Sequence, residues 1–248
     1  DPVRTAAGIR WAADNGATII AVPQSTVADV AELRDAVDYA TSLGALVVAS
    51  SGNSLDDVDD DVARFPAAYS PALAATAVDT AGYPSGSVAR GEHVEIAAPG
   101  QAVLSTFFGN GDCVFAGNAP STSYATGYVA GAAALVAAAY PDEQPADWEY
   151  RLLVTALRPA QAWRDGSIGW GIVAPASALT FINDGSVAGP PNPRFPAATQ
   201  APMPIAERPI APPDPVPERK TAVFALVGGV GALTLAALLA ARLRKKKS

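Results

Sequence analysis

Residues 121–136 read STSYATGYVAGAAALV, and this stretch decides how the rest of the chain is interpreted. Its apolar run predicts a long helix over residues 122–140 that is apolar nearly all round and therefore central in the fold. Ser123 comes at the start of this helix, where free backbone N–H groups and the helix dipole favour negative charge. Taken alone, Ser123 is interpreted as an N-cap residue before it is interpreted as a nucleophile.

Short strands and helices alternate through residues 1–185. The predicted strands are 18–22, 45–49, 74–78 and 94–97, and the predicted helices are 5–15, 27–43 and 122–140. Gly16 and Gly44 stand where the first two helices should end. Such alternation is typical of the α/β class, with a parallel sheet and helices on both of its faces.

Asn53 makes the catalytic interpretation of Ser123 much stronger. It ends the segment ASSGN, residues 49–53, which follows a predicted buried strand. Ligands of α/β folds bind at the carboxyl ends of strands, where the Asn53 amide can face a developing oxyanion. The alternative for Asn53 is an ordinary turn residue in the run Ser-Gly-Asn-Ser.

Five segments in this order resemble the subtilases, the subtilisin-like serine proteases. They are ALVVASSGN (45–53), FPAAYSPALAATAVD (65–79), VEIAAPGQAVLST (94–106), STSYATGYVAGAAALV (121–136) and GWGIVAPASAL (169–179). Within that family the chain is most similar to the mycosins, the membrane-anchored subtilases of actinobacterial type VII secretion. The resemblance implies a subtilisin-like α/β fold, Ser123 as nucleophile, Asn53 as oxyanion donor, and a protein or peptide substrate without a cofactor or metal.

The resemblance also implies a general base and its orienting Asp, in the chain order Asp, His, Ser. The one histidine, His93, follows Asn53 and is interpreted as a structural or surface residue. Asp14 resembles a helix-end residue of the family and not the triad Asp. We therefore expect the N-terminal part of the domain, with the triad His and Asp, to lie upstream of Asp1.

Two other functions stay open. A degenerate, non-catalytic subtilase module that acts as a scaffold in a secretion complex would also lack the base. A lipase-like hydrolase is disfavoured because it predicts G-x-S-x-G, and the chain has S-T-S-Y-A instead.

Three departures from the family pattern bear on activity. Ser121 replaces the usual Gly before Thr-Ser, and its Cβ is expected to crowd the approach to the nucleophile. Gly127 replaces the usual Pro, with little expected effect on the chemistry. Residues 19–25, IIAVPQS, replace a strand that pairs with the substrate in this family, and Pro23 removes a donor from it.

The C-terminal third predicts a membrane anchor. Residues 186–220 are expected to form a spacer, because 11 of the 22 prolines fall within residues 190–217. Residues 222–241 hold 20 consecutive uncharged residues, enough to span a bilayer, so we expect a transmembrane helix over 221–242. Five basic residues follow the uncharged run, namely Arg242 and four within residues 243–248. This excess of positive charge predicts that the C-terminal tail is cytoplasmic and that the protease domain is extracytoplasmic.

Charge and cysteine content set further limits. The net charge is -7, and outside residues 219–248 the chain holds 10 basic and 24 acidic residues, which argues against a nucleic-acid partner. Cys113 is the only cysteine and is expected to be a small buried residue or a thiol without its partner. Asp56, Asp57 and residues 59–61 form an acidic loop, for which solvation is favoured over calcium binding.

Overall fold

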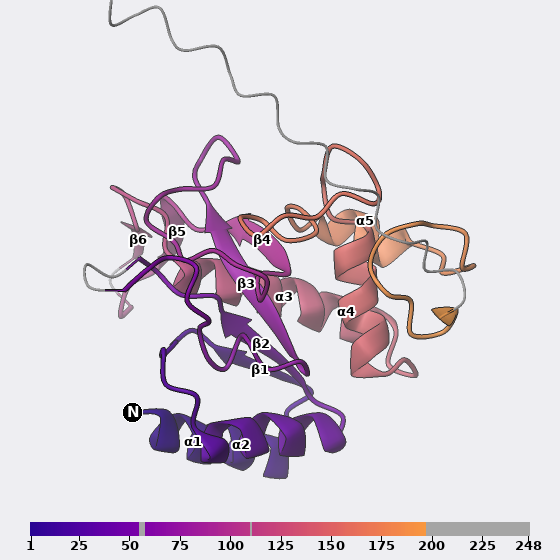
Figure 1. Cartoon of the computed structure of the whole chain (residues 1–248), viewed down its shortest axis with the longest axis horizontal. Coiled ribbons are helices and arrows are strands. Elements are labelled where there is room, and N and C mark those ends of the chain that lie inside the picture. The colour runs from indigo at the N-terminus through magenta and orange to yellow at the C-terminus, as the bar shows by residue number, and fades with distance from the viewer. Residues whose placement is uncertain (55–57, 110, 197–248) are drawn as a thin grey trace, which may run out of the picture. The chain divides into compact units, whose positions relative to one another are not determined.

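Four parallel strands form the central sheet of the computed structural model, which describes residues 1–54, 58–109 and 111–196 (Figure 1). The strands are β1 (Ile19–Val22), β2 (Leu46–Ser50), β3 (Ala72–Val78) and β4 (Ile96–Pro99), in the spatial order β1-β2-β3-β4. Ile19 pairs with Leu46, Val47 with Ala72, and Ala75 with Ile96. The predicted parallel sheet is confirmed, with strand bounds shifted by one or two residues.

Helices cover both faces of this sheet (Figure 1). Helices α1 (Pro2–Asp14) and α2 (Ala31–Ser42) pack on one face, and α3 (Thr122–Ala139), α4 (Pro145–Val154) and α5 (Pro175–Thr180) belong to the other side. A hydrophobic core lies on each face of the sheet, and alternate residues of β2 pack into one or the other. Val47 and Ala49 pack with α1 and α2, whereas Leu46 and Val48 pack with α3 and α4. Both faces are therefore buried, as a parallel sheet requires.

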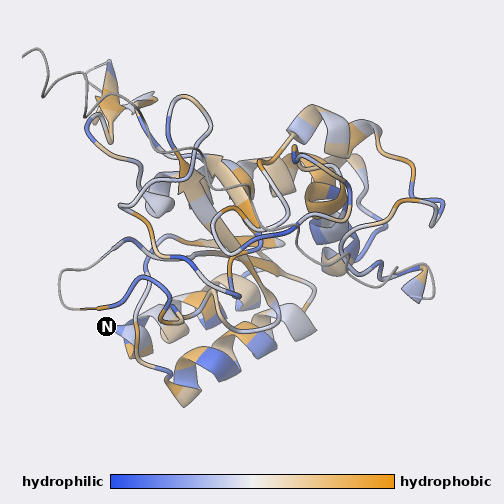
Figure 2. Ribbon diagram, turned by 45° about the horizontal axis from the view of Figure 1, so that its top comes forward, coloured by the Kyte–Doolittle hydropathy of each residue, from blue (hydrophilic) through white to orange (hydrophobic). Residues whose placement is uncertain are grey.

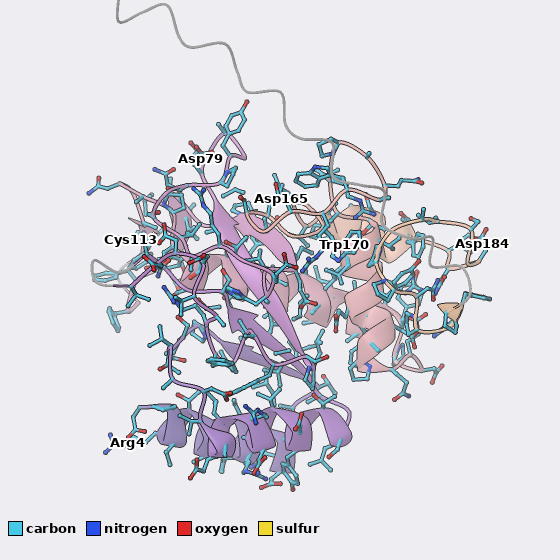
Figure 3. The ribbon with its side chains drawn as sticks, viewed as in Figure 1. Arg4, Asp79, Cys113, Asp165, Trp170 and Asp184 are labelled. Atoms are coloured by element: carbon cyan, nitrogen blue, oxygen red, sulfur yellow. The ribbon has the colours of Figure 1, made fainter. Side chains whose placement is uncertain are left out.

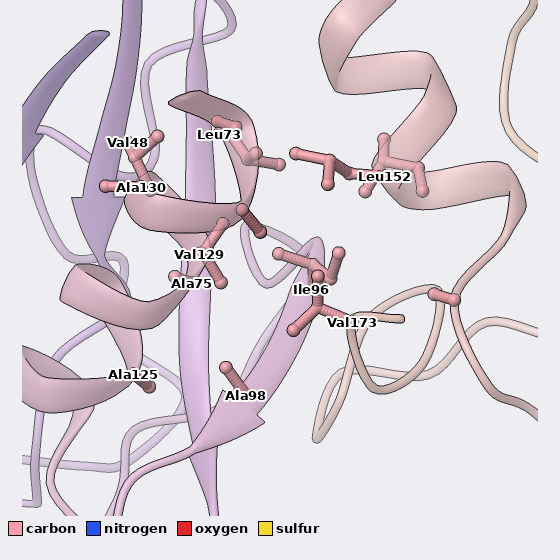
Figure 4. Packing of buried hydrophobic residues seen from close by; sticks show 14 of the residues in the cluster. Val48, Leu73, Ala75, Ile96, Ala98, Ala125, Val129, Ala130, Leu152 and Val173 are labelled. Carbon is pink, nitrogen blue, oxygen red and sulfur yellow. The ribbon is translucent and has the colours of Figure 1, made fainter. Parts of the chain in front are cut away.

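The core on the α3 side is built mostly from Ala and Val, as Figure 4 shows. Small side chains let α3 lie close to the strands, so that Ala125, Val129 and Ala133 are fully buried against the sheet. From the far side of this core, Leu152 of α4 and Val173 complete the packing. This close fit holds the start of α3 in a fixed position relative to the strand ends.

Local signals set the bounds of the first two helices. The Asp1 carboxylate accepts a hydrogen bond from the Val3 N–H at 3.0 Å and so caps α1, while Gly16 and Gly44 adopt positive φ after the helices, as predicted. Helix α2 begins at Ala31 and not at residue 27. The reason is that Thr26 is held in an antiparallel bridge with Phe65, through backbone hydrogen bonds of 2.8 and 2.9 Å.

Several elements went unpredicted. An antiparallel hairpin joins β5 (Val103–Thr106) and β6 (Asp112–Phe115) ahead of α3. Helix α4 begins with a capping box in which Gln144 and Asp147 exchange hydrogen bonds. Residues 169–173 cover the outer edge of β4 through hydrogen bonds such as Ala97 N–H to Gly171 O at 2.9 Å.

The last described residues fold back on α4. Arg194 forms an ion pair with Asp147 at 2.7 Å, and Asn192 and Asn183 exchange hydrogen bonds through their side-chain amides. The predicted boundary at residue 185 stays a prediction. The predicted transmembrane helix and basic tail lie outside the described residues, among which no helix is long and apolar enough to span a bilayer.

Candidate active site

Ser123 is the second residue of α3, and the residue in the N-cap position is Ser121. The Ser121 side chain makes no capping hydrogen bond, although its backbone has the extended conformation usual for a cap, with φ −129° and ψ 130°. The interpretation of Ser123 as an N-cap residue is therefore wrong. Because Ser121 has negative φ, its Cβ also has an ordinary position, and the expected crowding does not arise from its backbone conformation.

Asn53 caps the helix in place of Ser121. Its Oδ1 accepts hydrogen bonds from the Thr122 N–H at 3.0 Å and from the Thr122 hydroxyl at 3.2 Å. A backbone N–H can only donate, so the Asn53 atom that faces it must be the oxygen. The Asn53 NH₂ group accordingly points away from Thr122, and no acceptor for it exists among the described residues.

Thr122 joins the end of β2 and the loop after it to the helix. Its hydroxyl lies 2.7 Å from the Ser50 hydroxyl, and both side chains are buried. Within one residue, Thr122 therefore contacts the end of β2 and the loop that carries Asn53. The sequence analysis did not assign Thr122 a role, although it stands directly before Ser123.

The Ser123 hydroxyl donates a hydrogen bond to the Pro23 carbonyl oxygen at 3.0 Å. Pro23 directly follows β1, so the segment whose departure from the family pattern was noted lies beside the serine. The Ser123 N–H, in the first helical turn, has no acceptor in the described part of the chain. Ser123 thus presents a half-buried hydroxyl and a free N–H at the carboxyl ends of the strands.

Two glycines, Gly100 and Gly52, and the buried Arg64 pack against the segments that carry the site. At Gly100, a Cβ would lie 2.5 Å from the Ala77 Cβ and 2.7 Å from the Ser121 oxygen, so the segment AAPG must pass this close to the start of α3. Gly52 has φ +99°, and a Cβ there would lie 2.6 Å from Cγ of Arg64. The Arg64 side chain is 1% exposed and donates to the Val62 carbonyl at 2.9 Å, which places a positive charge behind the Asn53 loop.

His93 lies behind the site and does not contact Ser123. Its Nε2 is 3.1 Å from the Ser51 carbonyl oxygen, an acceptor only, so this nitrogen carries the proton. Burial lowers the pKa of His93, and the charges of Arg64 and Arg164 lower it further, while the Ser51 hydrogen bond opposes them. Asp14 ends α1 and accepts a hydrogen bond from the Tyr39 hydroxyl at 2.6 Å, far along the chain from Ser123.

The other candidate residues stay apart from this site. Cys113 is a half-exposed free thiol on β6, at the outer side of the molecule in Figure 3. Asp56 and Asp57 lie outside the described residues, and the described remainder contains no group of three or more His, Cys, Asp or Glu that could hold a metal ion. The geometry around Ser123 therefore involves no metal ligands among the residues described.

Comparison with known proteins decides the family. The model of the subtilase family of peptidases matches residues 2–171, more than half of the chain. The chain belongs to the subtilase family. Subtilisin DY of Bacillus licheniformis is 35% identical over 149 residues, which make up 60% of this chain and 53% of that protein. The chain spans about half the length, or less, of the curated subtilases it matches.

Solved structures of subtilases from secretion systems have the same fold. One is the serine protease MycP1, described as an essential component of the type VII (ESX-1) secretion system, with a TM-score of 0.63 and 27% identity over 72% of this chain and 57% of that chain. Another belongs to an intact ESX-5 inner membrane complex, with a TM-score of 0.62 and 28% identity over 94% of this chain and 60% of that chain. The resemblance to mycosins is thereby confirmed.

The Ser123 N–H and the Asn53 NH₂ group have no acceptor among the described residues. Backbone and side-chain donors of this kind are what acyl transfer uses to stabilise an oxyanion. Among the described residues, no His, Asp or Glu makes a hydrogen bond to the Ser123 hydroxyl.

Proposed function

We propose that this chain carries the nucleophile and the oxyanion-binding part of a subtilisin-like serine endopeptidase. Ser123 acts as nucleophile and Asn53 as oxyanion donor. The observation that carries the proposal is the pair of hydrogen bonds from Thr122 to Asn53 Oδ1, which aims the Asn53 NH₂ group while leaving it free. A plain turn residue would have no need of this link to the residue before the serine.

In the proposed reaction, Ser123 Oγ attacks the carbonyl carbon of a peptide bond and its proton passes to a general base. The carbonyl oxygen becomes negative, and the Ser123 N–H and Asn53 NH₂ stabilise it. The hydroxyl must first leave the Pro23 carbonyl, which cannot act as a base at neutral pH. Rotation about the Ser123 side-chain bond is enough to break that hydrogen bond.

The base and its orienting carboxylate come, in this proposal, from the portion of the domain that corresponds to the unmatched half of the relatives. Two surfaces would receive such a portion. The outer edge of β1 has no strand partner among the described residues. The outward stripe of α3 is uncharged and includes the exposed residues Tyr128 and Leu135, whereas Ala125, Val129 and Ala133 on its other side are buried.

Labelling with a fluorophosphonate probe tests the proposed function. The chain alone should react slowly at Ser123, and addition of the matching N-terminal portion of a mycosin domain should accelerate labelling by at least about 10³-fold, since a triad adds that order of rate. Ser123→Ala must abolish the labelling. No acceleration, or equal labelling of the Ser123→Ala chain, would show that Ser123 is not an activated nucleophile.

A non-catalytic scaffold is the second candidate function. It is favoured by the hydrogen bond that the Ser123 hydroxyl already makes to Pro23, and by the absence of a contacting base among the described residues. In this case the N-terminal portion would bind without producing labelling. Clear labelling of Ser123 in the chain alone would contradict the scaffold function directly.

We also propose that the chain is anchored in a membrane by a helix over 221–242, with the protease domain outside the cytoplasm and type VII secretion components as partners. Support comes from the uncharged run and basic tail of the sequence, and from the neighbour in the ESX-5 inner membrane complex. Extraction with alkaline carbonate should leave the full chain in the membrane and release a chain ending at residue 220. Release of both would contradict the anchor.

A further inference from the structure

Arg64 is the most deeply buried charged residue in the described part of the chain, and it lies behind the candidate active site. Only 1% of Arg64 is exposed, compared with 6% of Arg151 and 8% of Asp147. Figure 2 shows the strands of the sheet in hydrophobic colours, and Arg64 packs on Gly52, just after the end of β2. In apolar surroundings of this kind, a charge acts more strongly at a given distance than it does in water.

The guanidinium group of Arg64 has carbonyl partners and no carboxylate partner. It donates hydrogen bonds to the carbonyl oxygens of Val62 at 2.9 Å and Asp59 at 3.5 Å. Within the described ranges no Asp or Glu forms an ion pair with it, although residues 59–61 of the same loop are all Asp. A carbonyl oxygen satisfies a donor without cancelling its charge. Arg64 therefore keeps a full positive charge in the interior, where an uncompensated charge is costly.

Contacts connect this charge to the proposed oxyanion donor. A Cβ at Gly52 would lie 2.6 Å from Cγ and 3.0 Å from Nε of Arg64, so the Arg64 side chain lies directly against the Gly52 backbone. The next residue is Asn53, whose Oδ1 accepts the hydrogen bond from the Thr122 N–H. Ser123 follows Thr122, so the charge lies two short contacts away from the place where an oxyanion would form.

Backbone hydrogen bonds hold the Asn53 loop without help from this charge. The Ala89 N–H donates to the Gly52 carbonyl at 2.9 Å, and the Ser54 N–H donates to the Ser87 carbonyl at 3.0 Å. An uncharged side chain of similar length would also fill the space beside Gly52. The shape of the loop therefore requires the volume of Arg64 but not its charge.

The neighbouring ionisable groups do not replace this charge. His93 donates from Nε2 to the Ser51 carbonyl, and its pKa is lowered by burial and further by the charges of Arg64 and Arg164, so that its ring is neutral at pH 7. Arg164 itself forms an ion pair with Glu92 at 3.6 Å. Arg64 is therefore the better placed of the two arginines to act on the site.

We infer that the buried charge of Arg64 stabilises the oxyanion that forms when Ser123 attacks a substrate carbonyl. Arg64 is in this respect a positioning residue, since it acts through Gly52 and Asn53 and through space, without touching the substrate. The inference rests on the proposed function of Ser123 and Asn53. The carbonyl oxygen is neutral in the bound substrate and becomes negative during the attack, so the charge should raise kcat and leave KM nearly unchanged.

The first test measures the effect of the charge in the full chain, held in lipid nanodiscs, without any catalysis. Ser123→Cys in a Cys113→Ser background places a titratable thiol at the reacting position, and the pH dependence of its alkylation by iodoacetamide gives its pKa. Arg64→Met removes the charge and keeps an apolar side chain, and it should raise this thiol pKa by about 1, since charges about 10 Å apart interact by roughly that amount. Arg64→Lys should restore most of the difference.

The second test uses the chain complemented with the N-terminal portion of a mycosin domain. Arg64→Met should lower kcat for a peptide substrate about tenfold with KM within about twofold, and Arg64→Lys should recover most of kcat. Arg34→Met is the matched control, because it removes an exposed guanidinium that pairs with Asp29 on the surface. It should change the thiol pKa by less than about 0.2 and leave kcat unaltered.

The inference is overturned if Arg64→Met changes the thiol pKa by less than about 0.3, or if Arg64→Lys behaves like Arg64→Met. A rise in KM equal to the loss of kcat would also overturn it, because a distorted loop would explain both. If thermal unfolding shows that neither Arg64 variant folds, salt decides in the chain that retains Arg64. A thiol pKa lowered by a buried charge stays low in 1 M salt, whereas one lowered by the helix end or by surface charges returns toward its ordinary value, which would overturn the inference.

The two proposals can fail separately. The thiol pKa is measured without Ser123 Oγ and without a base, so a failure of probe labelling would leave this measurement intact. An absent effect of Arg64 on the thiol, conversely, would leave probe labelling of the native chain unaffected.

Discussion

Asn53 has two separable tasks at the residue scale. Its Oδ1 satisfies the Thr122 N–H at the start of α3, and its NH₂ group is the proposed oxyanion donor. A variant can retain the acceptor while losing the donor, because a carboxylate has two acceptor oxygens and no N–H. This makes it feasible to distinguish a structural from a catalytic role for one side chain.

Asn53→Asp should unfold at nearly the same temperature as the native chain, whereas Asn53→Ala should lose about 1 kcal/mol through the missing cap. Both should slow probe labelling of the complemented enzyme by about 10²–10³-fold, a figure that comes from a subtilisin and so from within this family. Thermal unfolding and labelling rates measure the two effects. Normal labelling of Asn53→Asp would show that the NH₂ group is not an oxyanion donor.

Gly100 is the residue where the approach of the β4 loop to α3 is closest. Gly100→Ala should destabilise the chain by about 1–3 kcal/mol, because the Cβ would overlap Ala77 and Ser121. Gly131 provides the matched control, as a Cβ there meets nothing within 4 Å on the exposed side of α3. Gly131→Ala should be neutral or stabilise by up to about 1 kcal/mol. Chemical denaturation measures both, and equal effects would refute the packing argument.

At the scale of elements, α4 meets the strands through two acidic side chains. Burial raises the pKa of Glu95 to about 7 and that of Glu149 to about 8, and the Glu95 charge adds to the rise at Glu149. Glu95 accepts a hydrogen bond from the Ala74 N–H at 3.0 Å, which acts in the other direction together with the charge of Arg164. The carboxyl groups are enclosed, although each residue keeps some exposed surface.

This pair should make stability fall as the pH rises from about 4.5 to about 8. The folded chain holds protons in that interval which the unfolded chain has released, so rising pH favours unfolding. Glu149→Gln should make this decrease of stability with pH less steep. It should also raise the melting temperature at pH 8 by a few degrees, the shift that corresponds to roughly 1 kcal/mol of unfolding free energy. Melting temperatures of both chains between pH 5 and 8 measure this effect. If the melting temperature of Glu149→Gln falls with pH as steeply as that of the native chain, the contribution of the Glu95 and Glu149 pair is contradicted.

The elements that the sequence predicted are those with strong periodic patterns. Residues 45–49 and 122–140 are apolar throughout, and the structure has a buried strand and a central helix there. The hairpin β5–β6 lacked such a signal, because its apolar residues lie on both faces and Ala102, Phe108 and Ala116 take positive φ without being glycine. The start of α2 was misplaced because the Thr26–Phe65 bridge is a long-range contact.

For the candidate site, the sequence predicted Asn53 after the end of a buried strand and Ser123 at the start of the long helix, and the structure brings the two segments together at the start of α3. The role of Thr122 and the hydrogen bond to Pro23 could not be predicted, since each depends on distances between segments up to 100 residues apart. The predicted start of the helix at residue 122 is confirmed, and Ser123, for which an N-cap role was the alternative, lies within the first helical turn.

At the scale of the whole molecule, the chain has a sheet covered on both faces and one strand edge without a partner among the described residues. Pro23 directly follows β1, whose outer edge is open among the described residues, and its carbonyl oxygen accepts the hydrogen bond from the Ser123 hydroxyl. A second portion of the domain packed there would bring its side chains within reach of Ser123.

Alone, the chain should hydrolyse casein or peptides poorly or not at all. Without a base, catalysis in this family falls to about 10³–10⁴-fold over water, far below protease rates. Release of peptide fragments over hours, compared with the Ser123→Ala chain, measures this. Turnover near normal protease rates that depends on Ser123 would contradict the expectation that the base is absent.

The most direct test of the central claim is intact-protein mass spectrometry after fluorophosphonate treatment, with and without the N-terminal portion of a mycosin domain. The account predicts a single adduct on Ser123 that forms rapidly only when both portions are present and is lost in Ser123→Ala. No adduct in the complemented sample, or one located on another residue, would contradict it.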